Sequence, residues 1–229
     1  MSLKFVDFCS GIGAGRLGLE QLGLECVAHS EINSDSDFTY QTLHNDNRNL
    51  GDLTTLKHNL IPSSDILIAG FPCQTFSIVG KRAGFEDERG QIIYHLRDIL
   101  VSKNIPYFIF ENVKGLVNHD GGRTLKAVVD LLDNAGYVTT YKVLNSINYG
   151  VPQLRERIYF VGIRKDLYNG TFNFPTPMNP VKLKDFLLSN NNDIQEIQHP
   201  TFRKYLDNKY NIGRININEL LKQDYLIID

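Results

Sequence analysis

The chain has few cysteines and no long hydrophobic run. Only three of its 229 residues are cysteines, Cys9, Cys26 and Cys73, and they form no CxxC pair. This odd, unpaired set argues against a disulfide framework or a zinc cluster and favours a reducing compartment. No uninterrupted apolar stretch reaches the roughly 18 residues that suggest a membrane span. We therefore expect a soluble, cytoplasmic protein with no membrane partner.

The chain also lacks a strong charge of either sign. Its 24 basic and 26 acidic residues give a net charge of −2. This argues against binding nucleic acid through a global positive field, although a local basic groove remains compatible with it. The six histidines form no HxH or HxxxH pair and GxSxG is absent, so we predict neither a metal site nor a serine-hydrolase elbow.

Short apolar runs alternate with amphipathic segments over most of the chain. The runs "KFVDFC", "ECVAHSE", "DILIAG", "YFIFEN" and "RIYFVGIR" are typical of buried strands, with helical patterns between them. This alternation predicts an α/β fold with a doubly wound, mostly parallel sheet in residues 1–185. Beyond it, "SNNNDIQEIQ" is polar and low in complexity, so we expect residues 186–229 to form a linker and the start of another unit.

Polar or reactive residues follow four of the predicted strands, in "DFCSGIG", "SEIN", "GFPC" and "FENV". Ligands of such sheets collect at the carboxyl ends of the strands. The glycines of the first segment would let backbone amides approach a ligand closely, and Glu31 lies where an acid can hold ribose hydroxyls. Together they suggest a nucleoside-bearing cofactor, although a structural turn explains the glycines equally well.

Cys73 stands at the end of a predicted strand. An unpaired cysteine is most often a small buried hydrophobe. Here, however, Pro72 fixes the backbone beside it, Gly70 allows a close approach, and a long polar loop follows, which is typical of an active-site element. Glu111 ends another predicted strand, directly after mostly apolar residues. It is either a carboxylate with a functional role or a solvated strand terminus.

A pair of basic residues precedes the last predicted strand. Arg155 and Arg157 can be ordinary surface charges. As alternate residues entering a strand they would point the same way, which suits gripping a polar substrate.

The ordered set "DFCSGIGAG", "SEIN", "GDLT", "GFPCQTFS", "ENVKG" and "QLRERIYFVG" closely resembles the motif series of the C5-cytosine DNA methyltransferases. The likeness covers residues 4–185 and corresponds to the catalytic part of bacterial restriction–modification enzymes. It implies the fold of S-adenosylmethionine-dependent methyltransferases, S-adenosyl-L-methionine as cofactor and double-stranded DNA as partner.

The resemblance also implies roles for individual residues. Cys73 would be the nucleophile that adds to cytosine C6, and Glu111 would hold or protonate N3. Arg157, with Arg155 nearby, would bind the O2 side of the base and steady either Glu111 or the backbone. The implied cofactor contacts are Asp7, Cys9, Ser10, Gly11, Ile12, Gly13, Glu31, Ile32, Asp52, Leu53 and Pro72. The implied nucleic-acid contacts are Gln74, Ser77, Lys81, Arg82, Arg89 and Gln153.

The chain departs from the family pattern in two respects. Most members have Phe in place of Cys9 and many have Trp in place of Ile32, so we expect a lower cofactor affinity. No segment matches the target-recognition domain or the closing cofactor motif. The chain is therefore expected to be one part of a split enzyme, a truncated gene product or a fragment, with a second polypeptide supplying the rest.

Two other functions are compatible with the same residues. An RNA cytosine-C5 methyltransferase of this fold would share the catalytic motifs, because substrate choice lies largely in the unmatched region. A catalytically silent binding chain would retain the cofactor loop, but intact Cys73, Glu111, Arg155 and Arg157 argue against it.

Overall fold

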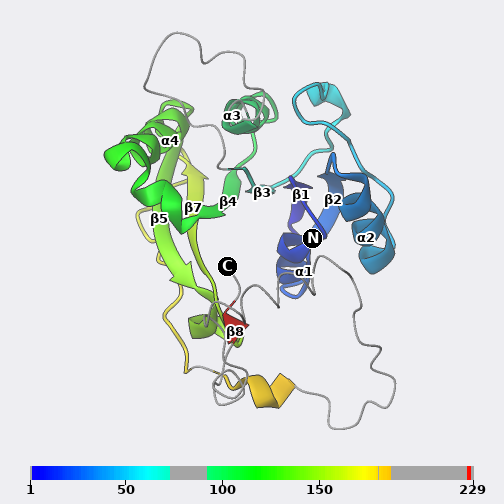
Figure 1. The fold of residues 1–229 in the computed structure, drawn as a ribbon. Coiled ribbons are helices and arrows are strands. Elements are labelled where there is room, and N and C mark those ends of the chain that lie inside the picture. Colours follow the sequence, from blue (N-terminus) through cyan, green and yellow to red (C-terminus); the bar gives the residue numbers. More distant parts are fainter. Residues whose placement is uncertain (1, 73–91, 180, 187–225, 228–229) are drawn as a thin grey trace. The chain divides into compact units, whose positions relative to one another are not determined.

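The computed structural model describes residues 2–72, 92–179, 181–186 and 226–227 (Figure 1). The strands are β1 (Lys4–Phe8), β2 (Glu25–Ser30), β3 (Ile66–Gly70), β4 (Tyr107–Val113), β5 (Tyr137–Asn145), β6 (Gln153–Leu154), β7 (Glu156–Arg164) and β8 (Leu226–Ile227). The α-helices are α1 (Ala14–Glu20), α2 (Ser34–His44), α3 (Ile92–Ser102) and α4 (Arg123–Asn134). The 3₁₀ turns are η1 (His58–Leu60), η3 (Lys114–Val117), η4 (His119–Gly122), η5 (Ser146–Tyr149) and η6 (Leu183–Phe186).

The chain divides into two compact units. The first comprises Met1–Val143 and Arg157–Phe174, and the second comprises Leu144–Glu156 and Pro175–Asp229. Within the second unit, β6 pairs with β8 in parallel. A domain boundary after residue 185 stays a prediction.

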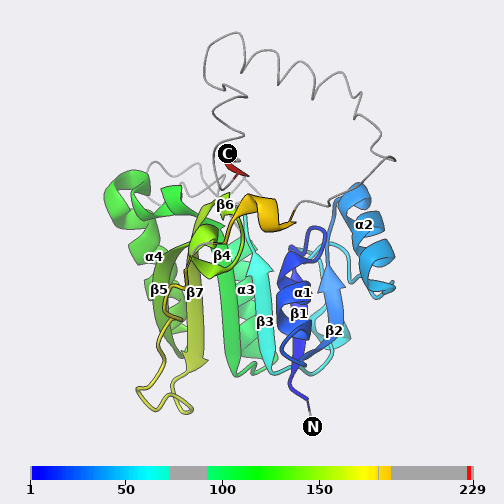
Figure 2. The same cartoon turned by 90° about the horizontal axis from the view of Figure 1, so that it is seen from below.

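The central sheet has the order β2-β1-β3-β4-β7-β5. Strand β1 pairs in parallel with β2 and β3, and β3 pairs in parallel with β4. Strand β7 runs antiparallel to β4 (Figure 2). Helices α3 and α4 lie on one face of the sheet and α1 lies on the other (Figure 1). The predicted doubly wound, mostly parallel sheet is therefore confirmed.

The strands are apolar because both faces of the sheet are covered. Every residue of β1 after Lys4 is buried. Helix α3 presents Ile93, Leu96 and Leu100 to the main core at helical spacing. In that core the rings of β4 also stack, since the centroids of Phe108 and Phe110 lie 4.4 Å apart.

Helix α1 approaches the sheet closely through Gly15. A β carbon at this position would lie 2.8 Å from Cδ1 of Ile68 on β3. The helix is also held by the buried Arg16, whose Nη1 donates to Asp46 Oδ2 at 2.6 Å and whose Nε donates to Glu20 Oε1 at 2.7 Å. Glycine packing and a paired buried cation thus fix the element that follows the glycine loop.

Strand β5 was not among the strands expected from the sequence. Its sequence, "YVTTYKVLN", mixes polar and apolar residues, and most of its side chains are only half-buried. As the last strand in the order, it is stabilised by pairing rather than by an apolar run. The sequence also placed Glu111 at a strand end, whereas β4 continues to Val113.

Gly162 on β7 pairs with Phe108 on β4, and a β carbon at 162 would overlap the phenylalanine ring. We expect Gly162→Ala to lower the free energy of unfolding by about 1–3 kcal/mol, because overpacking strains a dense core. Gly18→Ala on α1 is the matched control, since a β carbon there meets no atom within 4 Å. It should stabilise the chain by about 0.5–1 kcal/mol. Urea unfolding of both variants is the measurement, and equal effects would contradict the packing argument.

Candidate functional site

The turn after β1 requires glycine at two positions. Gly11 has a φ of +54° and Gly13 a φ of +90°, both in the left-handed region. A β carbon at Gly13 would also overlap the ring of His44. At Gly11 a β carbon would meet nothing within 4 Å. The turn is therefore packed against α2 at Gly13 and open at Gly11.

Glu31, directly after β2, is tied to this turn. Its Oε2 accepts the Gly11 backbone N–H at 2.8 Å, and its Oε1 accepts the Asn33 backbone N–H at 2.8 Å. A carboxylate has about four acceptor sites, so both oxygens keep capacity for ligand hydroxyls. The structure thus brings two of the predicted cofactor motifs together.

Exposed apolar side chains lie in the same two segments. Ile12 is 51% exposed and Ile32 is 76% exposed. A third segment, after α2, contributes the exposed Asp52, whose carboxylate accepts the Thr54 backbone N–H at 2.8 Å. Leu53 beside it is buried in the core, so only its backbone can face a ligand. This donor set fits an adenosyl group: an acid for the ribose hydroxyls, isoleucines for the base, and backbone amides.

Asp7 and Ser10 were predicted to contact the cofactor, but their side chains are buried. Among the described residues, Asp7 Oδ2 and Ser10 Oγ have no hydrogen-bond partner. Burial raises the pKa of Asp7 to about 8, although the Arg16 backbone N–H and the Arg16 charge lower it. Asp7 is thus an interior acid beneath the glycine turn.

Two of the three thiols are held protonated. Burial, with a smaller effect from the Glu31 charge, raises the pKa of Cys9 to about 12. Burial also raises the pKa of Cys26. A thiol with a raised pKa is a poor nucleophile at neutral pH. Cys73 lies outside the described residues, as do Gln74, Ser77, Lys81, Arg82 and Arg89.

Glu111 and Arg157 meet across β4 and β7. Arg157 Nε lies 3.0 Å from Glu111 Oε1, and both side chains are largely buried, with 21% and 31% exposed. The pair forms because β7 is antiparallel to β4, which places Arg157 opposite Val113, two residues from Glu111. Of the two partners expected for Arg157, Glu111 or the backbone, the structure shows an ion pair with Glu111, and the catalytic roles of both residues stay predictions.

The residue after Glu111 links this pair to the segment before Cys73. Asn112 is buried, and its Nδ2 donates to the Phe71 backbone oxygen at 2.9 Å. Gly70 pairs with Glu111, and a β carbon at 70 would lie 3.5 Å from Glu111 Oε2. Pro72, which directly precedes Cys73, is exposed. The ends of β3 and β4 therefore fix the backbone immediately before Cys73.

Arg155 and Gln153 belong to the second unit. The Arg155 backbone N–H donates to Asn145 Oδ1 at 3.2 Å, and the Gln153 backbone oxygen accepts from Ser146 Oγ at 2.6 Å. The roles predicted for their side chains stay predictions.

Within the described ranges, no group of three or more His, Cys, Asp or Glu side chains is arranged to hold a metal ion. A membrane-crossing helix is likewise absent from this part of the chain.

The sequence profile of the C-5 cytosine-specific DNA methylase family matches residues 3–228. The chain belongs to this family. It is 42% identical over 192 residues to the type II methyltransferase M.NgoBI of Neisseria gonorrhoeae, covering 84% of this chain and 59% of that protein. It is 40% identical over 198 residues to M.HhaI of Haemophilus parahaemolyticus, covering 86% and 59%. This C-5 methylase chain thus spans less than two thirds of the length of these curated relatives.

The fold is similar to that in the crystal structure of a DNMT2 mutant from Spodoptera frugiperda. The TM-score is 0.69 at 24% identity, over 83% of this chain and 61% of that chain. This likeness concerns the fold alone, and it agrees with the methyltransferase-type fold expected from the motifs.

Two residues of this site were not singled out from the sequence. Asn112 lies within the "ENVKG" motif, but no role was predicted for it, and Asn49 lies in a polar segment without a motif. Asn49 hydrogen-bonds the backbone of Glu31 on both sides. An asparagine in a loop carries no periodic signal, so only the fold reveals such partners.

The raised pKa of Asp7 predicts a pH-dependent stability. Between the ordinary value of 3.8 and about 8, the folded chain holds a proton on Asp7 that the unfolded chain releases. The stability contribution of Asp7 is therefore fully present below pH 3.8 and is lost as the pH rises through about 8, with a slope of up to about 1.4 kcal/mol per pH unit. We expect Asp7→Asn to gain stability relative to the parent as the pH rises from 5 to 8, measured by urea unfolding. Asp98→Asn, on the exposed side of α3, is the control, and a pH-independent difference for Asp7→Asn would contradict the assignment.

Proposed function

We propose that this chain is the catalytic part of a DNA (cytosine-5-)-methyltransferase that transfers a methyl group from S-adenosyl-L-methionine to C5 of cytosine. The observation that carries the proposal is the junction of β3 and β4, where Asn112 binds the backbone of Phe71 and Glu111 pairs with Arg157. This junction anchors the segment before Cys73 next to Glu111, and the Arg157 guanidinium holds the Glu111 carboxylate in place. The C-5 methylase family supplies the reaction, and the type II names of the relatives support a role in restriction–modification.

Cys73 acts as the nucleophile in this proposal. Its thiolate adds to cytosine C6, and the ring electrons then make C5 nucleophilic. Glu111 holds N3 and provides the proton that neutralises the developing negative charge on the ring. When C5 has taken the methyl group, a water molecule accepts the C5 proton, the C6–sulfur bond breaks to release the thiolate, and N3 returns its proton to Glu111, which restores the aromatic ring. The raised pKa of both other thiols supports the choice of Cys73.

Arg157 keeps Glu111 in one orientation. Its Nε lies 3.0 Å from Glu111 Oε1, and this ion pair restricts the rotation of the carboxylate that is to meet the base. A guanidinium also suits the O2 side of cytosine, because it presents several donors in one plane. We assign Arg155 to the same side of the base.

The cofactor supplies an electrophilic methyl group. Glu31 binds the ribose hydroxyls, with Cys9, Ser10, Gly11, Ile12 and Gly13 forming the turn that faces the nucleoside and methionine portions. Ile32, Asp52 and the Leu53 backbone would hold the adenine, and Pro72 would contribute on the side of the methyl group. Asp7 supports the turn from beneath. The open side of the turn at Gly11 supports this arrangement.

The target carbon of cytosine lies inside the base stack, so the base must leave the duplex to react. We assign Gln74, Ser77, Lys81, Arg82, Arg89 and Gln153 to the nucleic acid around the extruded base. Phosphate contacts position a protein but carry no sequence information. Reading of a target sequence is assigned to sequence beyond these 229 residues or to a second polypeptide, in keeping with the 59% coverage of M.NgoBI.

The covalent step is tested with duplex DNA that contains 5-fluorocytosine. In the presence of S-adenosylmethionine, C5 takes the methyl group but fluorine cannot leave C5 as a proton does, so the protein should remain bound covalently to the DNA. We expect Cys73→Ala to form no adduct on a denaturing gel, whereas the matched control Cys26→Ala forms one. A parallel reaction adds a candidate second polypeptide, and fluorinated RNA tests the alternative substrate. An adduct of parent yield from Cys73→Ala would refute the nucleophile, and an adduct with RNA alone would refute the DNA substrate.

The role of Glu111 is tested by Glu111→Gln. The amide keeps the size of the side chain but cannot supply a carboxylic proton. General acid–base groups contribute about 10²–10⁴-fold, so tritium transfer from labelled S-adenosylmethionine should slow by that factor. Glu25→Gln, exposed on β2, should retain the parent rate. A Glu111→Gln protein that methylates at the parent rate would rule out proton donation by this residue.

A further inference from the structure

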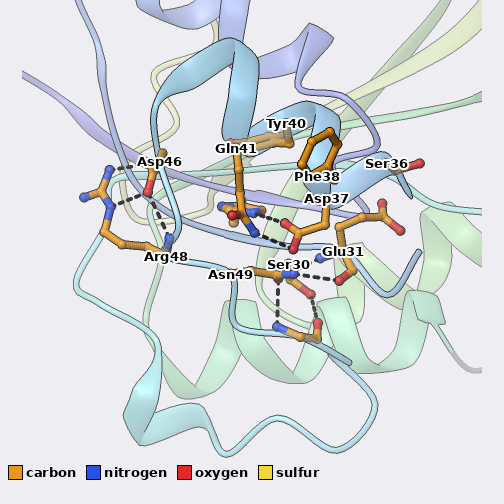
Figure 3. Close-up of polar contacts among 12 residues, drawn as sticks. Ser30, Glu31, Ser36, Asp37, Phe38, Tyr40, Gln41, Asp46, Arg48 and Asn49 are labelled. Carbon is orange, nitrogen blue, oxygen red and sulfur yellow. Dashed lines mark hydrogen bonds and ion pairs between the residues drawn. The ribbon is translucent and has the colours of Figure 1, made fainter. Parts of the chain in front are cut away.

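The side-chain amide of Asn49 makes three hydrogen bonds to backbone groups. Its Oδ1 accepts the Glu31 N–H at 3.1 Å and the Gly51 N–H at 2.8 Å, and its Nδ2 donates to the Glu31 carbonyl oxygen at 2.9 Å. Figure 3 shows Asn49 directly against Glu31. One side chain thus satisfies both backbone groups of Glu31, which lies one residue beyond the end of β2.

Asn49 is well placed for this because its segment runs beside the end of β2. His29 and Asn49 form a parallel bridge, and the Leu50 N–H donates to the His29 oxygen at 2.7 Å. Ser30 Oγ donates to the Gly51 oxygen at 2.6 Å. The backbone of the segment is therefore fixed at the two residues that follow Asn49.

The end of β2 is itself rigid. His29 is fully buried, and its ring stacks on Tyr40 with centroids 3.9 Å apart. His29 Nε2 lies 2.8 Å from Asp37 Oδ1, and Asp37 Oδ2 accepts from Gln41 Nε2 at 2.8 Å. Helix α2 thereby holds β2 in place at His29, whereas the N–H and carbonyl groups of Glu31 are held by Asn49.

We propose that Asn49 is a positioning residue that sets the orientation of the ribose-binding acid, an inference that rests on the proposed function. Asn49 touches Glu31 and not the ligand. With the Glu31 backbone held by Asn49 and its carboxylate held by the Gly11 and Asn33 amides, the acid is held in one orientation and keeps acceptor sites for a ligand. Vicinal ribose hydroxyls need two acceptors in a fixed geometry, and an ordered carboxylate binds them with less loss of entropy.

The test measures binding of S-adenosylhomocysteine to the purified chain by calorimetry. We expect Asn49→Ala to weaken binding about tenfold, because two hydrogen bonds that order Glu31 are lost. The matched control is Asn47→Ala, which removes an exposed amide from the same segment and should bind as the parent does. In a Glu31→Gln background, where the acid is already lost, Asn49→Ala should weaken binding less than twofold.

A second readout needs no ligand. The Gly11 and Asn33 amides donate to the Glu31 carboxylate, so their NMR resonances report its orientation. In Asn49→Ala both amides should shift and exchange faster with solvent. The amides of β3, which lie away from Asn49, should keep their protection and show that the chain is folded.

The outcomes separate this inference from the proposed function. Failure of the parent chain to bind the nucleoside would overturn the proposed cofactor and the positioning role together. Parent binding with an unchanged affinity in Asn49→Ala would overturn the positioning role alone. Equal weakening by Asn49→Ala in the parent and the Glu31→Gln backgrounds would also overturn it, because the effect would not pass through Glu31. Unchanged Gly11 and Asn33 amide resonances in Asn49→Ala would likewise overturn the positioning role.

Discussion

The hydrogen bond from the Gly11 amide to the Glu31 carboxylate connects the two segments on which the cofactor side of the molecule depends. It joins the turn after β1 to the segment after β2, and the parallel pairing of these strands brings the two ends to the same edge of the sheet. Because the bond uses only part of the carboxylate, it orders Glu31 and leaves it able to bind a ligand. The Glu31 carboxylate is thereby held in a fixed orientation as a hydrogen-bond acceptor.

The acidic residues near this edge of the sheet differ in their surroundings. Asp7, inside β1, is buried and has a raised pKa, whereas Glu31 accepts backbone amides at the surface. Glu111 is different again, since a guanidinium from the antiparallel β7 contacts it. Three carboxyl groups, on or directly after β1, β2 and β4, therefore lie in three different environments, and these match the three roles proposed for them: support of a turn, binding of hydroxyls, and proton transfer to a base. Their surroundings, rather than their residue type, make the difference.

The sequence predicted the strands that are buried on both faces, because their apolar runs and following glycines are local signals. It also located Glu31 and Glu111, since each ends or nearly ends such a run. It missed β5, a half-buried strand at the end of the sheet next to β7, and it missed Asn49, whose partner Glu31 lies 18 residues away. Side-chain burial was equally hidden: Asp7 and Leu53 belong to binding motifs in the sequence, yet both face the interior. Contacts between residues that are far apart in the sequence produce no periodic pattern of apolar residues, so the sequence alone does not reveal them.

The close contact of Gly15 with Ile68 has a consequence for variation within the family. The space between α1 and β3 at this point holds one branched aliphatic side chain and no more. The two positions share a single volume, although they are 53 residues apart in the sequence. A relative with alanine or serine at the first position needs the end of the second side chain to move, by a change of rotamer or by shortening to valine. We therefore expect the sizes of the side chains at these two positions to be matched.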